Sequence, residues 1–275
     1  MYLPDCVASH LGAWAMYPSR LRELVQMAKA KVLPTREAQA AEQRVSGGVP
    51  IDIQKGGVAV ISVAGVMMKG WSKFEGTVST AAVRRSIRQA SSDDEVESIL
   101  LRISSPGGFV DGTADLADDV AAAAQRKPVE AYIEDIGASA AYWVASQARK
   151  VYAGRTALVG SIGTYQVLWD ESKRFEADGI QVHVISTGAL KGAGTPGTEV
   201  TPEVLAYERR LVEALNDHFL AGVRAGRRLT PKQLDAVSTG EVWPAGEAQA
   251  LGLIDGVRSI DDVLSGLAAG GGMRG

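Results

Sequence analysis

Apolar residues along this chain alternate between short β-branched runs and segments with helical spacing. The runs at 57–66, 97–104 and 128–134 are rich in valine, isoleucine and leucine, which is typical of buried strands. Between them, 80–91 and 110–124 carry apolar residues at intervals of three and four, which predicts helices. Repeated strand–helix–strand units with short connections predict an α/β fold with a mostly parallel sheet covered by helices.

The pattern continues through the second half of the chain. We expect a helix at 139–148 and strands at 150–154, 164–169 and 180–186. A long helix at about 202–225 and two short helices then complete the fold.

The two ends of the chain differ from this body in composition. Residues 1–55 combine one expected helix, for which Ser19 is the candidate N-cap, with a polar linker-like stretch at 34–48. Residues 56–265 form the expected main domain. The glycine-rich end, 266–275, has little apolar surface to bury, so we expect it to be disordered.

Composition excludes several classes of protein. A chain of 275 residues with 46% hydrophobic content buries a large core, and a net charge of −3 leaves no basic surface for nucleic acid. The single cysteine, Cys6, excludes an internal disulfide, and no apolar run approaches the roughly 18 residues of a membrane span. Without a phosphate-binding fingerprint or a cluster with metal-ligand spacing, we expect no cofactor, no metal and no membrane anchor.

Three loops after expected strands carry candidate chemistry, because ligands of open α/β sheets bind at the carboxyl ends of the strands. Residues 104–108, Ser-Ser-Pro-Gly-Gly, allow backbone N–H groups to approach a negative oxygen, although a plain glycine turn has the same residues. Ser139 lies among alanines at a strand-to-helix turn, where it is either a nucleophile or a helix N-cap. Lys191 lies among glycines and small residues, where it is either a dehydrated base or an exposed loop lysine.

A Ser-His-Asp triad is the other common way to activate a serine. The three histidines are His10 in the N-terminal segment, His183 in an expected strand and His218 within the long helix. His183 is the credible imidazole base among them, because apolar neighbours around His218 favour a packing role.

Together these segments resemble the signal peptide peptidase A family and its phage relatives, the head maturation proteases, which belong to the ClpP/crotonase fold. The matching segments are SVAGVM (62–67), SSPGG (104–108), GASAAYW (137–143), VGSIGTY (159–165), the loop of Lys191, and EVWPAGEAQALGLID (241–255). The match covers about 57–258, and Lys191 follows Ser139 by 52 positions. A Pro-Gly-Gly sequence alone is weak evidence for this family, but the full set of segments in this order is specific for it.

The resemblance implies a serine endopeptidase with a Ser-Lys dyad in a fold of repeated β-β-α units. Ser139 would attack the scissile carbonyl, and Lys191 would accept its proton and later protonate the leaving amine. The backbone N–H of Gly108, or of Gly107, and that of Ala140 would form the oxyanion hole.

Further features of the site follow from the same resemblance. Ser161 matches a family serine that helps to orient the lysine. An extended substrate would add a strand to the edge near 108–110. Ala140 and Ala141 stand where many signal peptide peptidases have two glycines, which narrows the site without preventing the chemistry.

Within the family, the opening SHLGAWAMYPSRLRELV (9–25) resembles that of phage or prophage peptidases. This resemblance implies a homo-oligomeric ring that processes capsid or scaffold proteins in the host cytoplasm or inside a procapsid. Its dyad would lie within one chain or across a subunit boundary. The alternatives are a soluble housekeeping peptidase, a crotonase-type acyl-CoA enzyme and a non-catalytic scaffold module.

Overall fold

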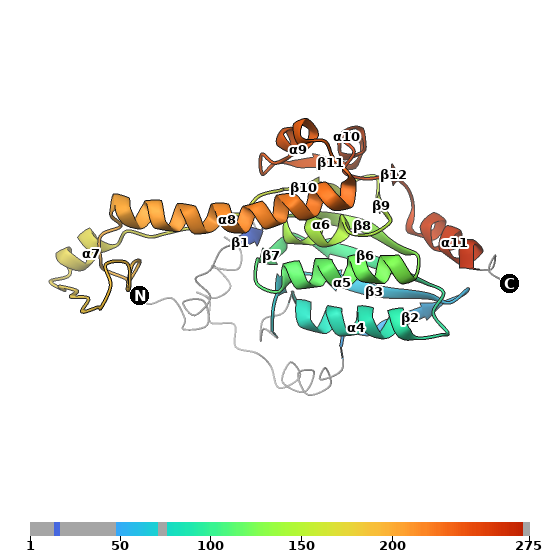
Figure 1. Ribbon diagram of the computed structural model, residues 1–275, viewed down its shortest axis with the longest axis horizontal. Helices are drawn as coiled ribbons and strands as arrows, with labels where there is room; N and C mark the ends of the chain where they lie inside the picture. Colours follow the sequence, from blue (N-terminus) through green and yellow to red (C-terminus); the bar gives the residue numbers. More distant parts are fainter. Residues whose placement is uncertain (1–13, 17–47, 71–75, 272–275) are drawn as a thin grey trace.

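The centre of the molecule is an eight-stranded, mostly parallel sheet, seen in a computed structural model that describes residues 14–16, 48–70 and 76–271 (Figure 1). Strands β3, β6, β8 and β10 are parallel neighbours, β2 and β11 pair antiparallel at the two ends, and β9 and β12 extend from β8. Their bounds are β2 Ile51–Gln54, β3 Val58–Ala64, β6 Ser98–Ser105, β8 Val129–Ala138, β9 Lys150–Ala153, β10 Leu158–Gly160, β11 Val242–Pro244 and β12 Gly256–Val257. The mostly parallel sheet predicted from the apolar runs is confirmed.

A second, four-stranded sheet has the order β1-β7-β4-β5. Its strands are β1 Trp14–Met16, β4 Val66–Met68, β5 Thr77–Ser79 and β7 Gly107–Phe109. β4 pairs in parallel with both β5 and β7, whereas β1 pairs antiparallel with β7. Because β3 leads into β4 and β6 leads into β7, each pair of strands followed by a helix forms one β-β-α unit.

Helices cover both faces of the central sheet. The helices are α4 Thr80–Ser92, α5 Thr113–Arg126, α6 Ala140–Ala145, α7 Ser172–Ala177, α8 Pro202–Arg227, α9 Pro231–Val237, α10 Ala245–Ala250 and α11 Ile260–Gly271. Ile99 and Leu101 of β6 join the main core with α4, α5 and α6, whereas Leu100 joins a separate cluster with Val263 and Leu267 of α11. Alternate side chains of β6 are thus buried on opposite faces, which explains its continuous apolar run.

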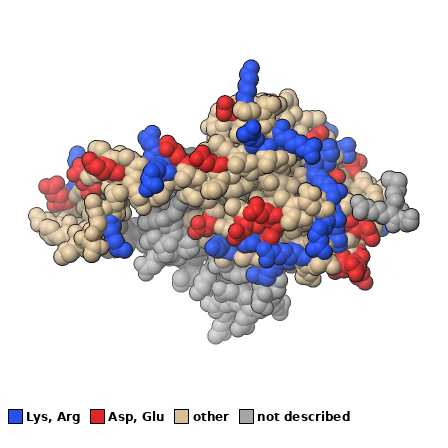
Figure 2. Space-filling model, in the orientation of Figure 1, with Lys and Arg blue, Asp and Glu red and all other residues tan. Residues whose placement is uncertain are grey.

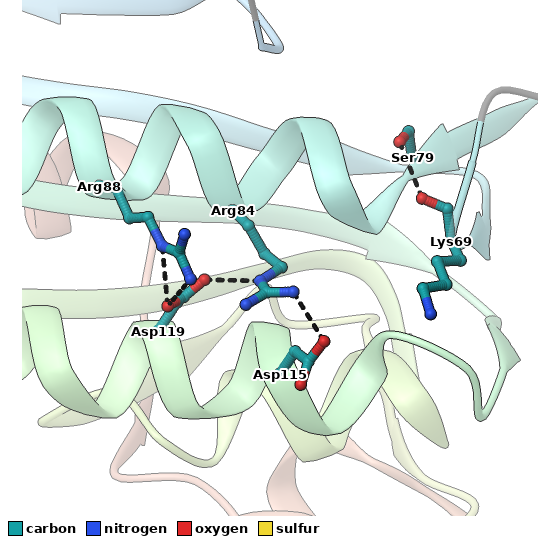
Figure 3. Close-up of polar contacts among 6 residues, drawn as sticks. All are labelled: Lys69, Ser79, Arg84, Arg88, Asp115 and Asp119. Carbon is teal, nitrogen blue, oxygen red and sulfur yellow. Dashed lines mark hydrogen bonds and ion pairs between the residues drawn. The ribbon is translucent and has the colours of Figure 1, made fainter.

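Ion pairs connect α4 to α5 on the surface (Figure 3). The guanidinium of Arg84 lies 2.7 Å from a carboxylate oxygen of Asp115 and 2.7 Å from one of Asp119, and Arg88 lies 2.9 Å from Asp119. Basic and acidic side chains lie next to each other over these two helices (Figure 2). At the start of α4, Ser79 Oγ accepts a hydrogen bond from the backbone N–H of Ala82 and so caps the helix.

Residues 164–205, called the arm from here on, run outward from the body together with the first part of α8 (Figure 1). Apart from an isolated bridge at Tyr165, the described residues between 164 and 200 form no strand, so the strands predicted at 164–169 and 180–186 are wrong for the single chain. A strand requires a partner strand to satisfy its backbone groups, and the arm extends beyond the edge of the sheet. The helix predicted at 202–225 is confirmed as α8.

The ends of the body differ from the expected boundaries. β2 belongs to the central sheet although it falls within 1–55, and α11 continues through 266–271, where disorder was expected. The reason is tertiary: Val263 and Leu267 bury their side chains under the sheet and hold the small-residue helix in place. The expected helix near Ser19 and most of the linker lie outside the described residues.

Candidate active site

Three chain segments meet at the carboxyl edge of the central sheet. Ser139 directly follows β8 and Ser161 directly follows β10, and these parallel neighbours place Ala138 opposite Gly160. Gly107 begins β7 one residue after β6, the neighbour of β8 on its other side. Two of the three loops predicted to carry chemistry are therefore adjacent, because parallel neighbouring strands end at the same edge.

Ser139 occupies a strained turn between β8 and α6. Its backbone has φ 56° and ψ −122°, a region that residues with a side chain rarely adopt. Two hydrogen bonds hold the turn: the N–H of Ser139 donates to the carbonyl of Gly160 at 2.7 Å, and the N–H of Trp143 donates to the carbonyl of Ser139 at 2.9 Å. Sharp strand-to-helix turns of this kind project a nucleophilic side chain clear of its neighbours.

The side chain of Ser139 has no structural task in the described part of the chain. Its Oγ is buried without a hydrogen-bond partner, and it makes no capping bond to α6. Ser139 thus stands at the N-cap position of α6, but its side chain does not cap the helix. A buried hydroxyl without a partner is unfavourable by about 1–3 kcal/mol, so its presence at a strained turn points to a chemical role.

The alanines around Ser139 are packed into the core. Ala138, Ala140 and Ala141 are all fully buried, so larger side chains have no room there. Ala140 is the first residue of α6, and the first N–H groups of a helix have no partner within the helix. Its N–H is therefore suited to bind an oxyanion next to Ser139, the role that the resemblance implies for it, and this role stays a prediction.

The two glycines of β7 differ in what their backbone can do. The N–H of Gly107 donates to Ser105 Oγ at 3.2 Å, and Gly107 has φ 95°. At Gly108, a Cβ atom would lie 1.9 Å from the carbonyl oxygen of Met67 on β4, so this position accepts no side chain. The N–H of Gly107 already has an acceptor in Ser105 Oγ, so it could serve an oxyanion only if that bond broke. Ser105, buried at the end of β6, was not singled out from the sequence, since only the folded turn reveals its bond to Gly107.

Ser161 lies beside the Ser139 turn. It is 5% exposed, has φ 51°, and donates its backbone N–H to the carbonyl of Glu241. Two serines with positive φ thus follow adjacent strands, which agrees with the expected supporting role of Ser161 but does not test it.

Helix α8 packs against α6, the helix that follows Ser139. The rings of Trp143 on α6 and Phe219 on α8 stack with centroids 5.0 Å apart. Gly222 and Gly226 allow this approach, because a Cβ at these positions would lie 2.2 Å from the Trp143 indole nitrogen and 2.1 Å from the carbonyl oxygen of Ser146. The sequence analysis missed this contact; the two glycines four residues apart in a long helix were the available signal.

Lys191 is not near Ser139 within one chain. It lies in a series of turns in the arm, its side chain is exposed, and its backbone N–H donates to the carbonyl of Gly188. The arm is anchored at its base, where the backbone N–H of Thr164 donates to Asn216 Oδ1 and its hydroxyl donates to the carbonyl of Val212, both on α8. The dehydration that the dyad requires is therefore not supplied by the described part of the same chain.

The other candidate bases and metal ligands are no better placed. His183 is exposed on the arm and His218 is exposed on α8, whereas His10 lies outside the described residues. Within 14–16, 48–70 and 76–271, no group of histidine, cysteine or acidic side chains could hold a metal ion. None of the helices in these ranges has the length and apolar character needed to cross a bilayer.

Comparison with known proteins gives a family match. The family model described as Peptidase family S49 matches residues 121–274, more than half of the chain. Protease 4 of Salmonella typhi is 31% identical over 211 residues, which cover 76% of this chain and 34% of that protein. Capsid assembly protease C of Escherichia phage lambda is 28% identical over 212 residues, covering 76% of this chain and 48% of that protein. The chain thus spans between a third and a half of the length of these two relatives.

Solved structures show the same fold. An enoyl-CoA hydratase/isomerase family protein from Silicibacter pomeroyi aligns with a TM-score of 0.52 and 15% sequence identity, covering 82% of this chain and 83% of that chain. At this identity the likeness concerns the crotonase fold alone, as the β-β-α units predicted. It does not extend to acyl-CoA chemistry.

Proposed function

Because this chain belongs to peptidase family S49, we propose that it is a serine endopeptidase in which Ser139 is the nucleophile and Lys191 of a neighbouring copy is the general base. The observation that carries the proposal is the Ser139 hydroxyl, buried at a strained turn and without a partner among the described residues. Such a group is poised for a base and a substrate, neither of which the described part of one chain places beside it.

The proposed reaction follows from the groups at the sheet edge. Lys191 takes the proton of the Ser139 hydroxyl as Oγ attacks the scissile carbonyl carbon, and the resulting oxyanion accepts hydrogen bonds from Gly108 and Ala140. The lysine then protonates the leaving amine, and a water molecule hydrolyses the acyl-enzyme. Losing one oxyanion donor typically weakens transition-state binding by about 3 kcal/mol.

The arm supports a dyad built across a subunit boundary. With the exceptions of Ile53 and Val257, the large exposed apolar side chains of the described residues all lie between 167 and 205. The most exposed are Trp169 at 69% and Ile185 at 98%. Apolar groups concentrated on a projecting segment mark an interaction surface, and a second copy that covers them would also dehydrate the lysine beside them.

A head-to-tail contact of this kind repeats from copy to copy and closes into a ring when the rotation permits. We therefore propose a homo-oligomeric ring in which each arm completes the site of the next protomer. The segments at 164–169 and 180–186, which form no strand beyond the isolated bridge at Tyr165, have strand-like sequences and would find strand partners in that contact.

Mixing two inactive variants tests the shared site. Ser139→Ala and Lys191→Ala chains should each be inactive, whereas an equal mixture should recover roughly a quarter of wild-type activity, because one site in four combines both intact groups. Lys173→Ala, which removes another exposed lysine of the arm, should keep full activity. If the mixture stays inactive while wild-type cleaves, the dyad does not cross a boundary. If Lys191→Ala keeps full activity and His183→Ala loses it, the base is the histidine.

Labelling with a fluorophosphonate tests the nucleophile directly. Wild-type should be labelled at Ser139, and Ser146→Ala, which removes another buried serine of the same helix region, should be labelled equally. A chain that cleaves peptides but takes up no label at Ser139 would refute the assignment.

The proposed substrate is a capsid or scaffold protein of a phage or prophage, processed in the host cytoplasm or procapsid. The similarity to Capsid assembly protease C supports this choice over a housekeeping role, which the similarity to Protease 4 would favour instead. Co-expression with the capsid and scaffold proteins encoded beside the gene should give cleaved products with wild-type and none with Ser139→Ala. Intact proteins in both cases would contradict the phage role.

A further inference from the structure

The outer edge of β7, next to the candidate oxyanion hole, is already paired with another segment of the same chain, β1. β1 pairs antiparallel with β7, with Trp14 opposite Phe109, Ala15 opposite Gly108 and Met16 opposite Gly107. β7 is the strand to which an extended substrate is expected to add, if the proposed peptidase function holds. The N-terminal segment therefore stands in the place of a substrate.

β7 has only one edge available for an added strand. Its other edge pairs with β4, where Met67 lies opposite Gly108 and leaves no space for even a Cβ atom. The strand order β1-β7-β4-β5 places β1 at the outer edge (Figure 1). A peptide that pairs with β7 and residues 14–16 thus exclude each other.

β1 runs toward the Ser139 turn. Running from Phe109 toward Gly107, it approaches the end of β7 that connects through Pro106 to β6. Ser105, the last residue of β6, is paired with Gly137, two positions before Ser139. A peptide lying along β7 in this direction would lead its C-terminal end toward Ser139.

The nucleophile is covered in the same state. Ser139 is 1% exposed, so a substrate carbonyl cannot reach it without some rearrangement. β1 is short, with only three register pairs to β7, and a short strand is readily exchanged for another strand with the same backbone hydrogen bonds.

We propose that residues 14–16 form an autoinhibitory strand, an internal substrate mimic that a polypeptide must displace from β7 before cleavage. The ligand class at this edge is an extended polypeptide segment, bound mainly through its backbone. The inference rests on the proposed peptidase function and adds that the resting enzyme keeps its own peptide-binding edge filled.

The test uses full-length protein carrying Ser139→Ala, so that a bound peptide is not cleaved. The probe is a fluorescein-labelled peptide copying residues 10–19, HLGAWAMYPS, and its Kd is measured by anisotropy. Neighbouring N–H groups of a strand point to opposite sides, so either Trp14 or Ala15 points its N–H at β7. Replacing both residues by proline removes that N–H in either case. If β1 leaves the edge free for a tenth of the time or less, the Kd should fall about tenfold or more. The matched control, Trp14→Tyr with Ala15→Ser, keeps both N–H groups and should bind like the parent.

Hydrogen exchange gives a second readout that does not depend on the proline variant folding. Saturating peptide should speed exchange at residues 14–16 while residues 107–109 stay protected. Unchanged exchange at 14–16 with peptide bound, or an unchanged Kd in a folded proline variant, refutes the autoinhibitory strand even if Ser139 is confirmed as the nucleophile. If no variant binds or cleaves any peptide, the peptidase function itself fails, and this inference fails with it.

Discussion

Replacing Ser139 should stabilise the fold, although serine-to-alanine changes at buried sites usually destabilise. In the described chain, its Oγ is buried without a partner. Removing a buried hydroxyl that lacks a hydrogen bond relieves an unfavourable contribution of about 1–3 kcal/mol. We therefore expect Ser139→Ala to raise the free energy of unfolding by about 1 kcal/mol or more.

Ser146 supplies a matched control from the end of the same helix. It is also buried, but its Oγ donates to the carbonyl of Trp143 at 2.6 Å and accepts from Gln147 at 2.8 Å. Ser146→Ala removes both bonds, so it should lower the free energy of unfolding by about 1–2 kcal/mol. The two alanine variants should therefore differ in free energy of unfolding by about 2–5 kcal/mol, with opposite signs relative to wild-type.

Backbone strain adds a third step to the series. Alanine keeps the Cβ atom and therefore the strain at φ 56°, whereas glycine tolerates this conformation. Strain of this kind amounts to about 1–3 kcal/mol, and the greater freedom of unfolded glycine offsets about 0.5–1 kcal/mol of it. Ser139→Gly should then be more stable than Ser139→Ala by about 1 kcal/mol.

The assay is equilibrium unfolding in urea, at protein concentrations low enough to keep the chain monomeric. Comparing midpoints at constant slope gives the differences in free energy. If Ser139→Ala loses stability as Ser146→Ala does, the hydroxyl has a partner in the folded chain, and the argument for a poised nucleophile is wrong.

Two further predictions concern the support of the site. Gly222→Ala places a methyl group against the indole nitrogen of Trp143, so it should lower stability and the proposed peptidase activity, although alanine has the better helix propensity. The control Gly266→Ala has open space around it and should leave stability unchanged or raise it. Urea unfolding of both variants measures the difference. Burial raises the pKa of Asp255, but hydrogen bonds from the Val151 N–H and from Arg227 outweigh it and hold the pKa below its ordinary value. The ionised carboxylate therefore contributes fully to stability above the unfolded pKa of about 3.9, and this contribution is lost as the pH falls through the lower folded pKa. Asp255→Asn should remove this loss and so reduce the fall in stability at acid pH. An unchanged fall would contradict this account.

Much of the fold could be read from local patterns. β6 is buried on both faces, which produces its continuous apolar run, and α4 is buried on one face, which produces apolar residues at intervals of three and four. Both patterns repeat within a few residues and are visible in the sequence. The position of Ser139 was also predictable from local sequence, because an apolar run, a few small residues and a helical pattern in this order place the turn at the small residues.

Tertiary structure decided what those residues do. Whether Ser139 caps α6 depends on one backbone conformation that the β8–β10 contact holds in place, and no local pattern encodes it. The run at 180–186 has the composition of a strand, yet it forms none, because a strand also needs a partner that lies beside it in space. Likewise, three unremarkable residues at 14–16 become a strand only because β7 offers an open edge more than ninety positions away in the chain. Hydrophobic periodicity is a property of neighbours in sequence, whereas hydrogen-bond partners and the burial of one hydroxyl depend on which distant segments the folded chain brings together.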